Sequence, residues 1–347
     1  MLNRKNCYRF NSLSKLDKDC NTLMKSEILE QRLIAQAIMD WHKNEDFEFR
    51  TSGSTGIPKS ISFSKDQVKA SINQSKVAFN LSSNDTALIS LPMRYVAGKM
   101  MLYRALQIGM NVVTFDPKVE LEDVIGESVS FAAFVPQQID YLIESRDGRK
   151  WLESIRIVLV GGSAINLSLE AKLRTLSNEV YHTYGMTETL THIAVKKLSQ
   201  GGSNSFSPLP NVSLSVSKEN TLVIFAHHLG VKLETNDVVR LNEDQSFLVF
   251  GRIDNVINSG ALKIHPENLE SIFRKYIPND LIVLGVPDER WGEKVVLVIE
   301  STFSIDPEWI MAAKSEIPRT KWPKQIKYVN KLPRTESGKV IRKNVFI

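Results

Sequence analysis

Residues 51–59, Thr-Ser-Gly-Ser-Thr-Gly-Ile-Pro-Lys, have the composition of a loop that holds a polyphosphate. Glycines let backbone N–H groups approach a ligand closely, Ser and Thr hydroxyls add hydrogen bonds, and Lys59 adds a positive charge. The segment is not the common P-loop, Gly-x-x-x-x-Gly-Lys-Ser/Thr, because Pro58 stands where that motif has its second glycine. Taken alone, the same residues are explained equally well by a polar hairpin turn between 47–50 and 60–63.

Two further segments carry small and polar residues where a ligand could bind. Gly161-Gly162-Ser163-Ala164 ends a buried strand, and ligands of open α/β sheets bind at the carboxyl ends of strands. Thr187 and Glu188 follow Tyr184-Gly185-Met186. The alternative for the first segment is an ordinary strand-to-helix turn. Taken alone, Thr187 and Glu188 favour the capped start of a helix over a ligand site.

The elements that must position these segments alternate regularly. Apolar runs at 86–90, 111–115, 131–135 and 155–160 predict buried strands, and helical patterns lie between them at 65–79, 96–107, 137–145 and 166–176. The alternation predicts an α/β fold with a parallel sheet. An amphipathic pattern over 26–42 predicts one further helix before the loop.

The pattern changes twice further along the chain. Short runs at 212–216, 221–225, 238–241 and 247–250 predict a β-meander or a small β-barrel-like part. Helices at 266–276 and 307–316 and strands at 281–286 and 294–300 then predict a small α+β domain. We expect a large N-terminal domain over residues 1–252 and a small mobile C-terminal domain over residues 253–347.

Composition and charge exclude several classes of protein. The chain has 347 residues, 42% of them hydrophobic and 24% charged, which is typical of a globular protein of about two domains. Its net charge of +5 is spread along the sequence and is weak evidence for nucleic-acid binding. Two cysteines cannot form a disulfide framework or a Cys/His metal site. We find no signal peptide and no membrane span, and we expect a cytoplasmic protein.

Six segments in a fixed order resemble the adenylate-forming family of acyl-CoA synthetases, nonribosomal adenylation domains and luciferases. They are the loop at 51–59, Tyr184–Thr189, Asp237, the run from Gly251-Arg252-Ile253-Asp254 through 257–270, Gly285–Asp288 with 291–293, and Pro333–Lys339. Segments 91–99 and 189–194 resemble most the short o-succinylbenzoate–CoA ligases of menaquinone biosynthesis. Much of the N-terminal region of larger family members has no counterpart here.

The resemblance implies a ligase reaction in two halves. A carboxylate attacks the α-phosphate of ATP to give an acyl-adenylate and pyrophosphate, and the thiol of coenzyme A then displaces AMP. Catalysis is expected to consist of positioning and electrostatic stabilisation. The implied catalytic residues are Lys339, which would bridge the carboxylate and the α-phosphate, Thr187, which would bind the α-phosphate, and Glu188, which would bind Mg²⁺.

The nucleotide site follows from the same resemblance. Tyr184 would stack on adenine, the 161–164 turn would lie along the base, and Asp237 and Arg252 would bind the ribose. The full set implied for the nucleotide is Thr51, Ser52, Gly53, Ser54, Thr55, Gly56, Lys59, Gly161, Gly162, Ser163, Ala164, Tyr184, Gly185, Met186, Asp237 and Arg252. Asn236 stands where the family usually has Gly, and we expect the turn there to survive because Asn tolerates left-handed backbone.

Movement of the small domain is also implied. Asp254 matches the hinge of the family, and Ser259, Gly260 and Ala261 match the loop that lines the coenzyme A channel in the second half-reaction. Ala261 replaces the usual second glycine of that loop, and alanine does not readily adopt a positive φ.

The acid would bind to the segment around residues 91–105 and to the residues after the nucleotide motif. An acid with a second carboxylate needs a cationic partner if that carboxylate is buried. The candidates are Arg94, Tyr95, Lys99, Arg104 and His192. The alternative for the three cations is an amphipathic helix with a charged surface, and Tyr95 and Val96 do not exclude an apolar fatty-acid pocket.

Three functions of different classes therefore remain open. The first is an ATP-dependent acid–CoA ligase for o-succinylbenzoate or for another aryl or fatty acid. The second is an adenylation enzyme that loads a carrier protein, against which residues 91–105 contain no carboxylate for an amino substrate. The third is a nucleotide-binding module without activity. The expected ligands are a carboxylic acid, ATP, Mg²⁺ and coenzyme A, and the sequence leaves a homodimer open.

Overall fold

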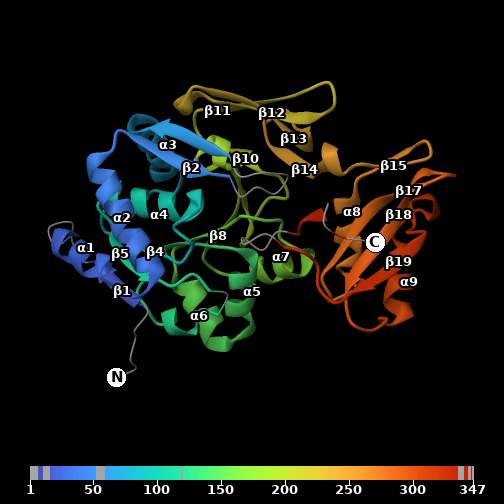
Figure 1. Cartoon of the computed structure of the whole chain (residues 1–347), viewed down its shortest axis with the longest axis horizontal. Helices are drawn as coiled ribbons and strands as arrows, with labels where there is room; N and C mark the ends of the chain where they lie inside the picture. Colours follow the sequence, from blue (N-terminus) through green and yellow to red (C-terminus); the bar gives the residue numbers. More distant parts are fainter. Residues whose placement is uncertain are drawn as a thin grey trace.

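The computed structural model describes residues 16–51, 59–118, 120–334, 340–342 and 345, and the backbone of residues 7–10; for residues 16–19 it also describes the backbone only. The chain folds into a large N-terminal domain and a small C-terminal domain that lies beside it (Figure 1). The predicted class, α/β with an additional small α+β domain, is confirmed.

The largest sheet has the strand order β1-β5-β4-β6-β7-β8-β9-β10. Its central strands β5, β4, β6, β7 and β8 run parallel, as the alternating pattern predicts. At the two edges, β1 pairs antiparallel with β5, β9 pairs antiparallel with β8, and β10 pairs antiparallel with β9. The strands are β1 (Cys7–Phe10), β4 (Thr86–Ile89), β5 (Asn111–Phe115), β6 (Phe131–Phe134), β7 (Ile157–Val160), β8 (Glu179–Gly185), β9 (His192–Lys197) and β10 (Ser207–Pro208).

Helices cover both faces of this sheet, so each central strand buries residues on two sides. On β4, for example, Ala87 and Ile89 belong to one buried cluster and Leu88 belongs to the other. The first cluster is closed by α1 (Leu16–Met24), α2 (Leu29–Lys43), α3 (Lys65–Ala78) and α4 (Val96–Ile108), and the second by α5 (Pro136–Glu144), α6 (Arg146–Ser154) and α7 (Leu167–Leu173).

The loop at 51–59 joins a two-stranded antiparallel hairpin, β2 (Asp46–Arg50) and β3 (Ser60–Ser64). Phe47, Phe49 and Phe63 point into the core, and the polar residues between them face outward. Thr51 N–H donates to the Lys59 carbonyl at 2.9 Å, and Lys59 N–H donates to Thr51 Oγ1 at 2.9 Å. The hairpin interpretation is therefore correct for the flanking backbone, and it is compatible with a phosphate-binding loop.

The third part of the large domain is a four-stranded antiparallel meander, as predicted: β11 (Val212–Val216), β12 (Thr221–Ala226), β13 (Val231–Leu241) and β14 (Phe247–Arg252). The sequence located only the second half of β13. Its first half alternates the exposed Lys232 and Glu234 with partly buried residues, which gives a weak hydrophobic signal.

The small domain has one sheet of order β16-β15-β18-β17, with β19 parallel to β18. Two helices, α8 (Pro266–Phe273) and α9 (Pro307–Ser315), pack on one face of the sheet, and Leu332 and Val340 pack on the other. The strands are β15 (Ile257–Ser259), β16 (Leu262–Ile264), β17 (Leu281–Asp288), β18 (Gly292–Glu300) and β19 (Gln325–Val329).

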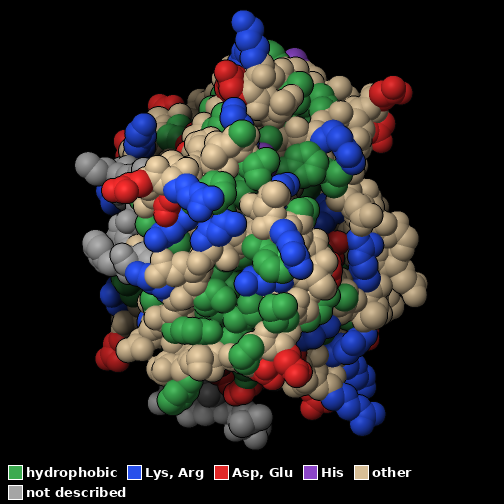
Figure 2. All heavy atoms as spheres, turned by 90° about the vertical axis from the view of Figure 1, so that its right-hand side faces the viewer, with side chains coloured by type: hydrophobic (Ala, Val, Ile, Leu, Met, Phe, Trp, Pro, Cys, Tyr) green, Lys and Arg blue, Asp and Glu red, His purple; other side chains and the backbone are tan. Residues whose placement is uncertain are grey.

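The outer surface of the small domain mixes apolar and basic side chains. Figure 2 looks onto this domain and shows hydrophobic side chains gathered near the middle of the face, with Lys and Arg around them. Large hydrophobic residues that the domain exposes include Phe303, Trp309, Met311 and Tyr328. Within the described ranges, no helix is long and apolar enough to cross a membrane.

Candidate active site

Tyr184 lies at the end of β8 and forms one side of an aromatic cluster. Its ring centroid is 5.7 Å from that of Phe206 and 5.2 Å from that of Phe247. Its hydroxyl donates a hydrogen bond to Oδ2 of Asp237 on β13. Burial and then the charge of Asp237 raise the pKa of Tyr184, so the phenol remains a protonated donor at neutral pH.

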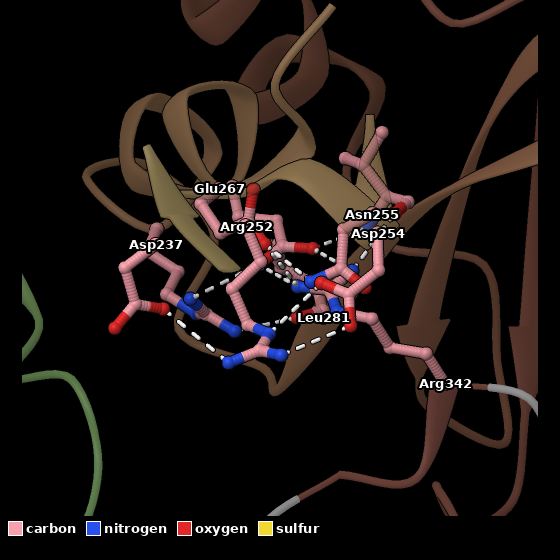
Figure 3. A network of polar contacts seen from close by, with 10 residues as sticks. Asp237, Arg252, Asp254, Asn255, Glu267, Leu281 and Arg342 are labelled. Carbon is pink, nitrogen blue, oxygen red and sulfur yellow. Dashed lines mark hydrogen bonds and ion pairs between the residues drawn. The ribbon is translucent and has the colours of Figure 1, made fainter. Parts of the chain in front are cut away.

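Arg252 lies between two carboxylates where the two domains meet (Figure 3). Asp237 and Arg252 are partners across the β13–β14 pair, with Nη1 of Arg252 3.3 Å from Oδ1 of Asp237. Nε and Nη2 of Arg252 are 2.9 and 3.0 Å from the two oxygens of Asp254. Burial would raise the pKa of Asp254, but the hydrogen bonds and charge of Arg252 outweigh this effect and lower it. Asp237 is thus held by Tyr184 on one oxygen and by Arg252 on the other.

The 161–164 turn follows β7 at the carboxyl edge of the parallel sheet, beside the end of β8. Gly161 N–H donates to the Phe134 carbonyl at 3.0 Å, and Gly162 has a φ of +86°. A Cβ at Gly161 would lie only 2.3 Å from Oγ1 of Thr183. The first glycine therefore permits close packing against β8, and the second permits the left-handed turn.

Thr187 and Glu188 form a short 3-10 helix, Thr187–Thr189, directly after β8. The next residue, Leu190, has a φ of +63°, and Thr191 N–H donates across it to the Thr189 carbonyl at 2.7 Å. This is a γ-turn with positive φ, a strained geometry for a leucine. Such strain persists where surrounding contacts impose it, and it is concentrated at functional sites.

The oxygen donors at this position suit a magnesium ion bound together with phosphates. The described segments contain no group of three or more His, Cys, Asp or Glu residues that could hold a metal ion by themselves. Mg²⁺ takes oxygen ligands and is commonly held by one or two carboxylates with phosphates and water. The half-buried Glu188 beside the Thr187 hydroxyl fits that pattern.

Arg104 and His192 come together in the core, although 88 positions separate them in the sequence. Arg104 on α4 is 1% exposed, and its Nη2 lies 3.2 Å from Oγ of Ser75 on α3. Nε2 of His192 lies 3.2 Å from the same hydroxyl. Arg104 forms no ion pair with a carboxylate among the described side chains, and its Nε has no hydrogen-bond partner there.

Burial perturbs both groups of this pair. It lowers the pKa of Arg104 to about 10. Burial and then the charge of Arg104 lower the pKa of His192 to about 3, so the imidazole is neutral at pH 7. His192 is also the cross-strand partner of Gly185, next to Tyr184. The buried cation therefore lies close behind the nucleotide motif.

The other predicted acid-binding residues lie elsewhere on α4 and before it. Lys99 turns toward the hairpin, with Nζ 3.3 Å from the Glu48 carbonyl and 5.6 Å from the Phe49 ring centroid. Arg94 is exposed and lies over the Tyr95 ring at 5.3 Å. The structure thus separates these three residues from Arg104 and His192.

The predicted hinge and coenzyme A loop lie on the small-domain side. Asp254 belongs to a 3-10 helix, Ile253–Asn255, between β14 and β15. Gly260 and Ala261 form the turn between β15 and β16, Gly260 has a φ of +62°, and the preceding Ser259 is buried. Ala261 has no positive φ, so its methyl group is tolerated. Asn236 lies inside β13 without a positive φ, and the left-handed turn that we expected there was wrong.

Several predicted site residues, Ser52, Gly53, Ser54, Thr55, Gly56 and Lys339, lie outside the described residues. The structure places the flanks of both segments. Thr51 and Lys59 close the hairpin, and Arg334 pairs with Val340 in an isolated antiparallel bridge.

Two family models together match most of the chain. The model of the AMP-binding enzyme family matches residues 49–228, and that of the AMP-binding enzyme C-terminal domain matches residues 279–339. The chain belongs to the AMP-binding enzyme family. The chain is similar to the 2-succinylbenzoate–CoA ligase of a Geobacillus species, 26% identical over 327 residues, and to a 4-chlorobenzoate–CoA ligase of an Arthrobacter species, 26% identical over 340 residues.

The chain matches only part of the length of these relatives. It spans about two thirds of these relatives, 66% and 65% of their lengths, while 84% and 86% of its own length is covered. An acyl-CoA synthetase-like protein of Dyadobacter fermentans matches it nearly end to end, with a TM-score of 0.64, 27% identity and coverage of 97% and 98%. The o-succinylbenzoate coenzyme A synthetase of Bacillus subtilis, solved with ATP and magnesium, shares the fold with a TM-score of 0.76 at 22% identity, over 86% of this chain and 69% of that one.

Sequence reasoning missed four residues at this site. Phe206 and Phe247 form the aromatic cluster with Tyr184, and Ser75 joins Arg104 to His192. His182, two residues before Tyr184 on β8, also packs on Phe206, and burial lowers its pKa to about 4. Only His182 carried a signal, because residues two apart in a strand share a face.

Proposed function

We propose that the protein is an ATP-dependent acid–CoA ligase that forms an acyl-adenylate and pyrophosphate and then transfers the acyl group to coenzyme A. The observation that carries this proposal is the fixed Asp237 carboxylate between Tyr184 and Arg252, in a chain of the AMP-binding enzyme family. A carboxylate oriented in this way is suited to accept hydrogen bonds from the two hydroxyls of a ribose.

We propose the nucleotide roles that the family resemblance implies. The Tyr184 ring and the 161–164 turn would hold adenine, with Gly185 and Met186 beside it, and Asp237 and Arg252 would hold the ribose. The hairpin closed by Thr51 and Lys59 would present residues 52–56 to the β- and γ-phosphates. Thr187 would donate its hydroxyl to the α-phosphate, and Glu188 would hold Mg²⁺, which neutralises phosphate charge when bound. Lys339 would stabilise the charge that develops between the carboxylate and the α-phosphate.

The acid is proposed to carry a second carboxylate, as o-succinylbenzoate does. The support is Arg104, a fully buried guanidinium without a carboxylate partner among the described residues, next to the neutral His192. A buried cation without a counter-charge is unfavourable, and an anionic ligand would remove that cost. Arg94, Tyr95 and Lys99 would line the path to this position or remain at its rim.

The small domain, residues 253–347, is proposed to rotate about Asp254 between the half-reactions. In the second orientation the turn Ser259-Gly260-Ala261 would line the coenzyme A channel. We further propose that the reaction belongs to menaquinone biosynthesis in the cytoplasm, where ATP and coenzyme A are available.

A panel of carboxylic acids tests the proposal. Pyrophosphate release and thioester formation should be faster with o-succinylbenzoate than with benzoate, 4-chlorobenzoate, a fatty acid or an amino acid. Turnover with one of the other acids and none with o-succinylbenzoate would refute the substrate assignment. Lys339→Ala should lose adenylate formation and keep thioester formation from supplied acyl-adenylate, and intact adenylation in this variant would refute the mechanism.

A further inference from the structure

Glu267, on helix α8 of the small domain, lies directly against the backbone of Gly251, on the last strand of the large domain. A Cβ at residue 251 would be 2.3 Å from Oε2 of Glu267 and 2.9 Å from its Cδ. Gly251 has a φ of +149°, which also favours glycine. The carboxylate therefore occupies space that exists only because residue 251 has no side chain.

The same carboxylate is hydrogen-bonded to the segment that joins the domains (Figure 3). Nδ2 of Asn255 donates to Oε1 of Glu267 at 2.6 Å. Asn255 follows Asp254, which Arg252 holds through two hydrogen bonds. Glu267 thus links α8 to the end of β14 and to the hinge.

The contact leaves one oxygen of Glu267, the buried Oε2, without a hydrogen bond among the described residues. An unsatisfied carboxylate oxygen has lost its hydration without compensation. Release of this contact would recover that hydration, which offsets part of the loss of the Asn255 hydrogen bond.

Glu267 also lies near Arg342, which is held by the same helix. Arg342 places its Nη2 2.8 Å from Oε2 of Glu270 and its Nη1 2.7 Å from Oε1 of the same residue, and it lies 3.9 Å from Oε1 of Glu267. Glu270 is 3% exposed and also accepts the Val283 N–H at 2.8 Å. Helix α8 therefore holds Arg342, which follows Lys339 by three residues in the sequence.

We propose that Glu267 is a positioning residue for adenylate formation. Its contacts with Gly251 and Asn255 hold α8, and with it the small domain, against the end of β14, in an orientation that we assign to the first half-reaction. This inference rests on the proposed function, in which Lys339 acts in the first half-reaction and the small domain moves before the second.

Single-turnover kinetics of the two half-reactions test the role of Glu267. Glu267→Ala should lower the rate of adenylate formation about tenfold, with the KM for ATP within about twofold of wild type. Thioester formation from supplied acyl-adenylate and coenzyme A should be unchanged or faster. Glu267→Gln should retain most of the adenylation rate, because its amide oxygen still accepts from Asn255.

Matched variants separate this role from a general loss of stability. Asn255→Ala should reproduce most of the effect of Glu267→Ala, and the double variant should be slowed by less than the product of the two single effects, because both changes remove the Asn255–Glu267 hydrogen bond. Glu308→Ala, at an exposed position of α9, should behave as wild type. Equal losses in both half-reactions, additive effects of the two changes or an unchanged adenylation rate in Glu267→Ala would overturn the inference. If Lys339→Ala abolishes adenylation while Glu267→Ala does not alter it, the positioning role alone is wrong; if Lys339→Ala keeps adenylation, the proposed mechanism is wrong.

Discussion

Replacement of Arg104 by methionine should separate the stability of the protein from its affinity for the acid. Methionine has a similar length and carries no charge, so it fills most of the space between α4, Ser75 and the Phe131 ring, which lies 5.7 Å from the guanidinium. The variant removes a fully buried cation that has no acidic partner among the residues the structure describes.

The magnitude follows from the pKa of the guanidinium. Burial lowers it from 12.5 to about 10, and each unit corresponds to about 1.4 kcal/mol, so the charged form costs the folded state on the order of 3 kcal/mol. A base whose folded pKa is depressed carries this cost in full below its folded pKa, so the cost is present at pH 7. The hydrogen bond to Ser75 offsets part of it, and we expect the variant to gain about 1–2 kcal/mol in the free energy of unfolding.

Binding of the acid should change in the opposite direction. Loss of a charge-assisted hydrogen bond to a carboxylate is worth about 1.5–3 kcal/mol, so the KM for o-succinylbenzoate should rise roughly 10- to 100-fold. The KM for its monoester, which keeps the activated carboxylate and lacks the second charge, should change by less than about threefold.

Urea unfolding and pyrophosphate-release kinetics on the same preparations measure both quantities. Arg149→Met is a matched control, because Arg149 is a partly exposed arginine of α6 that pairs with Glu153. Equal increases in KM for the acid and its monoester would refute the assignment of Arg104 to the second carboxylate. A loss of more than about 2 kcal/mol in stability would show that the guanidinium is a structural group.

Two further predictions concern His192 and Gly161. The pKa of His192 is depressed from 6.5 to about 3 in the folded protein, so its contribution to stability is complete above pH 6.5 and is lost as the pH falls toward 3. His192→Gln should therefore reduce the slope of unfolding free energy against pH by up to about 1.4 kcal/mol per unit between pH 6 and 4, and an unchanged slope in urea titrations would contradict the burial of a neutral imidazole. Gly161→Ala, whose methyl group would meet Thr183 Oγ1, should raise the KM for ATP about tenfold. Adding Thr183→Ala should restore most of the affinity, with Thr183→Ala alone as the control; no recovery would mean that the loss has another origin.

The sequence by itself determined the order of elements in the large domain and the family to which the chain belongs. Both depend on patterns within short stretches of the sequence. The apolar run of β7 and the turn after it lie within a few residues of one another, and the period of α3 agrees with its capping box, in which Ser64 accepts from Gln67 N–H and Gln67 accepts from Ser64 N–H. Such signals do not depend on what the segment packs against.

The tertiary structure alone decided how the charged residues are distributed. Lys99 and Arg104 lie on one helix, and the sequence predicted both equally as partners of the acid. Five positions along a helix turn them about 140° apart. Lys99 therefore reaches the hairpin, and Arg104 reaches the core beside His192. The contact of Glu267 with Gly251 joins two domains, and no periodic pattern in the sequence predicts it. Contacts of this kind depend on the geometry with which distant elements pack, and this geometry is fixed only when the whole chain is folded.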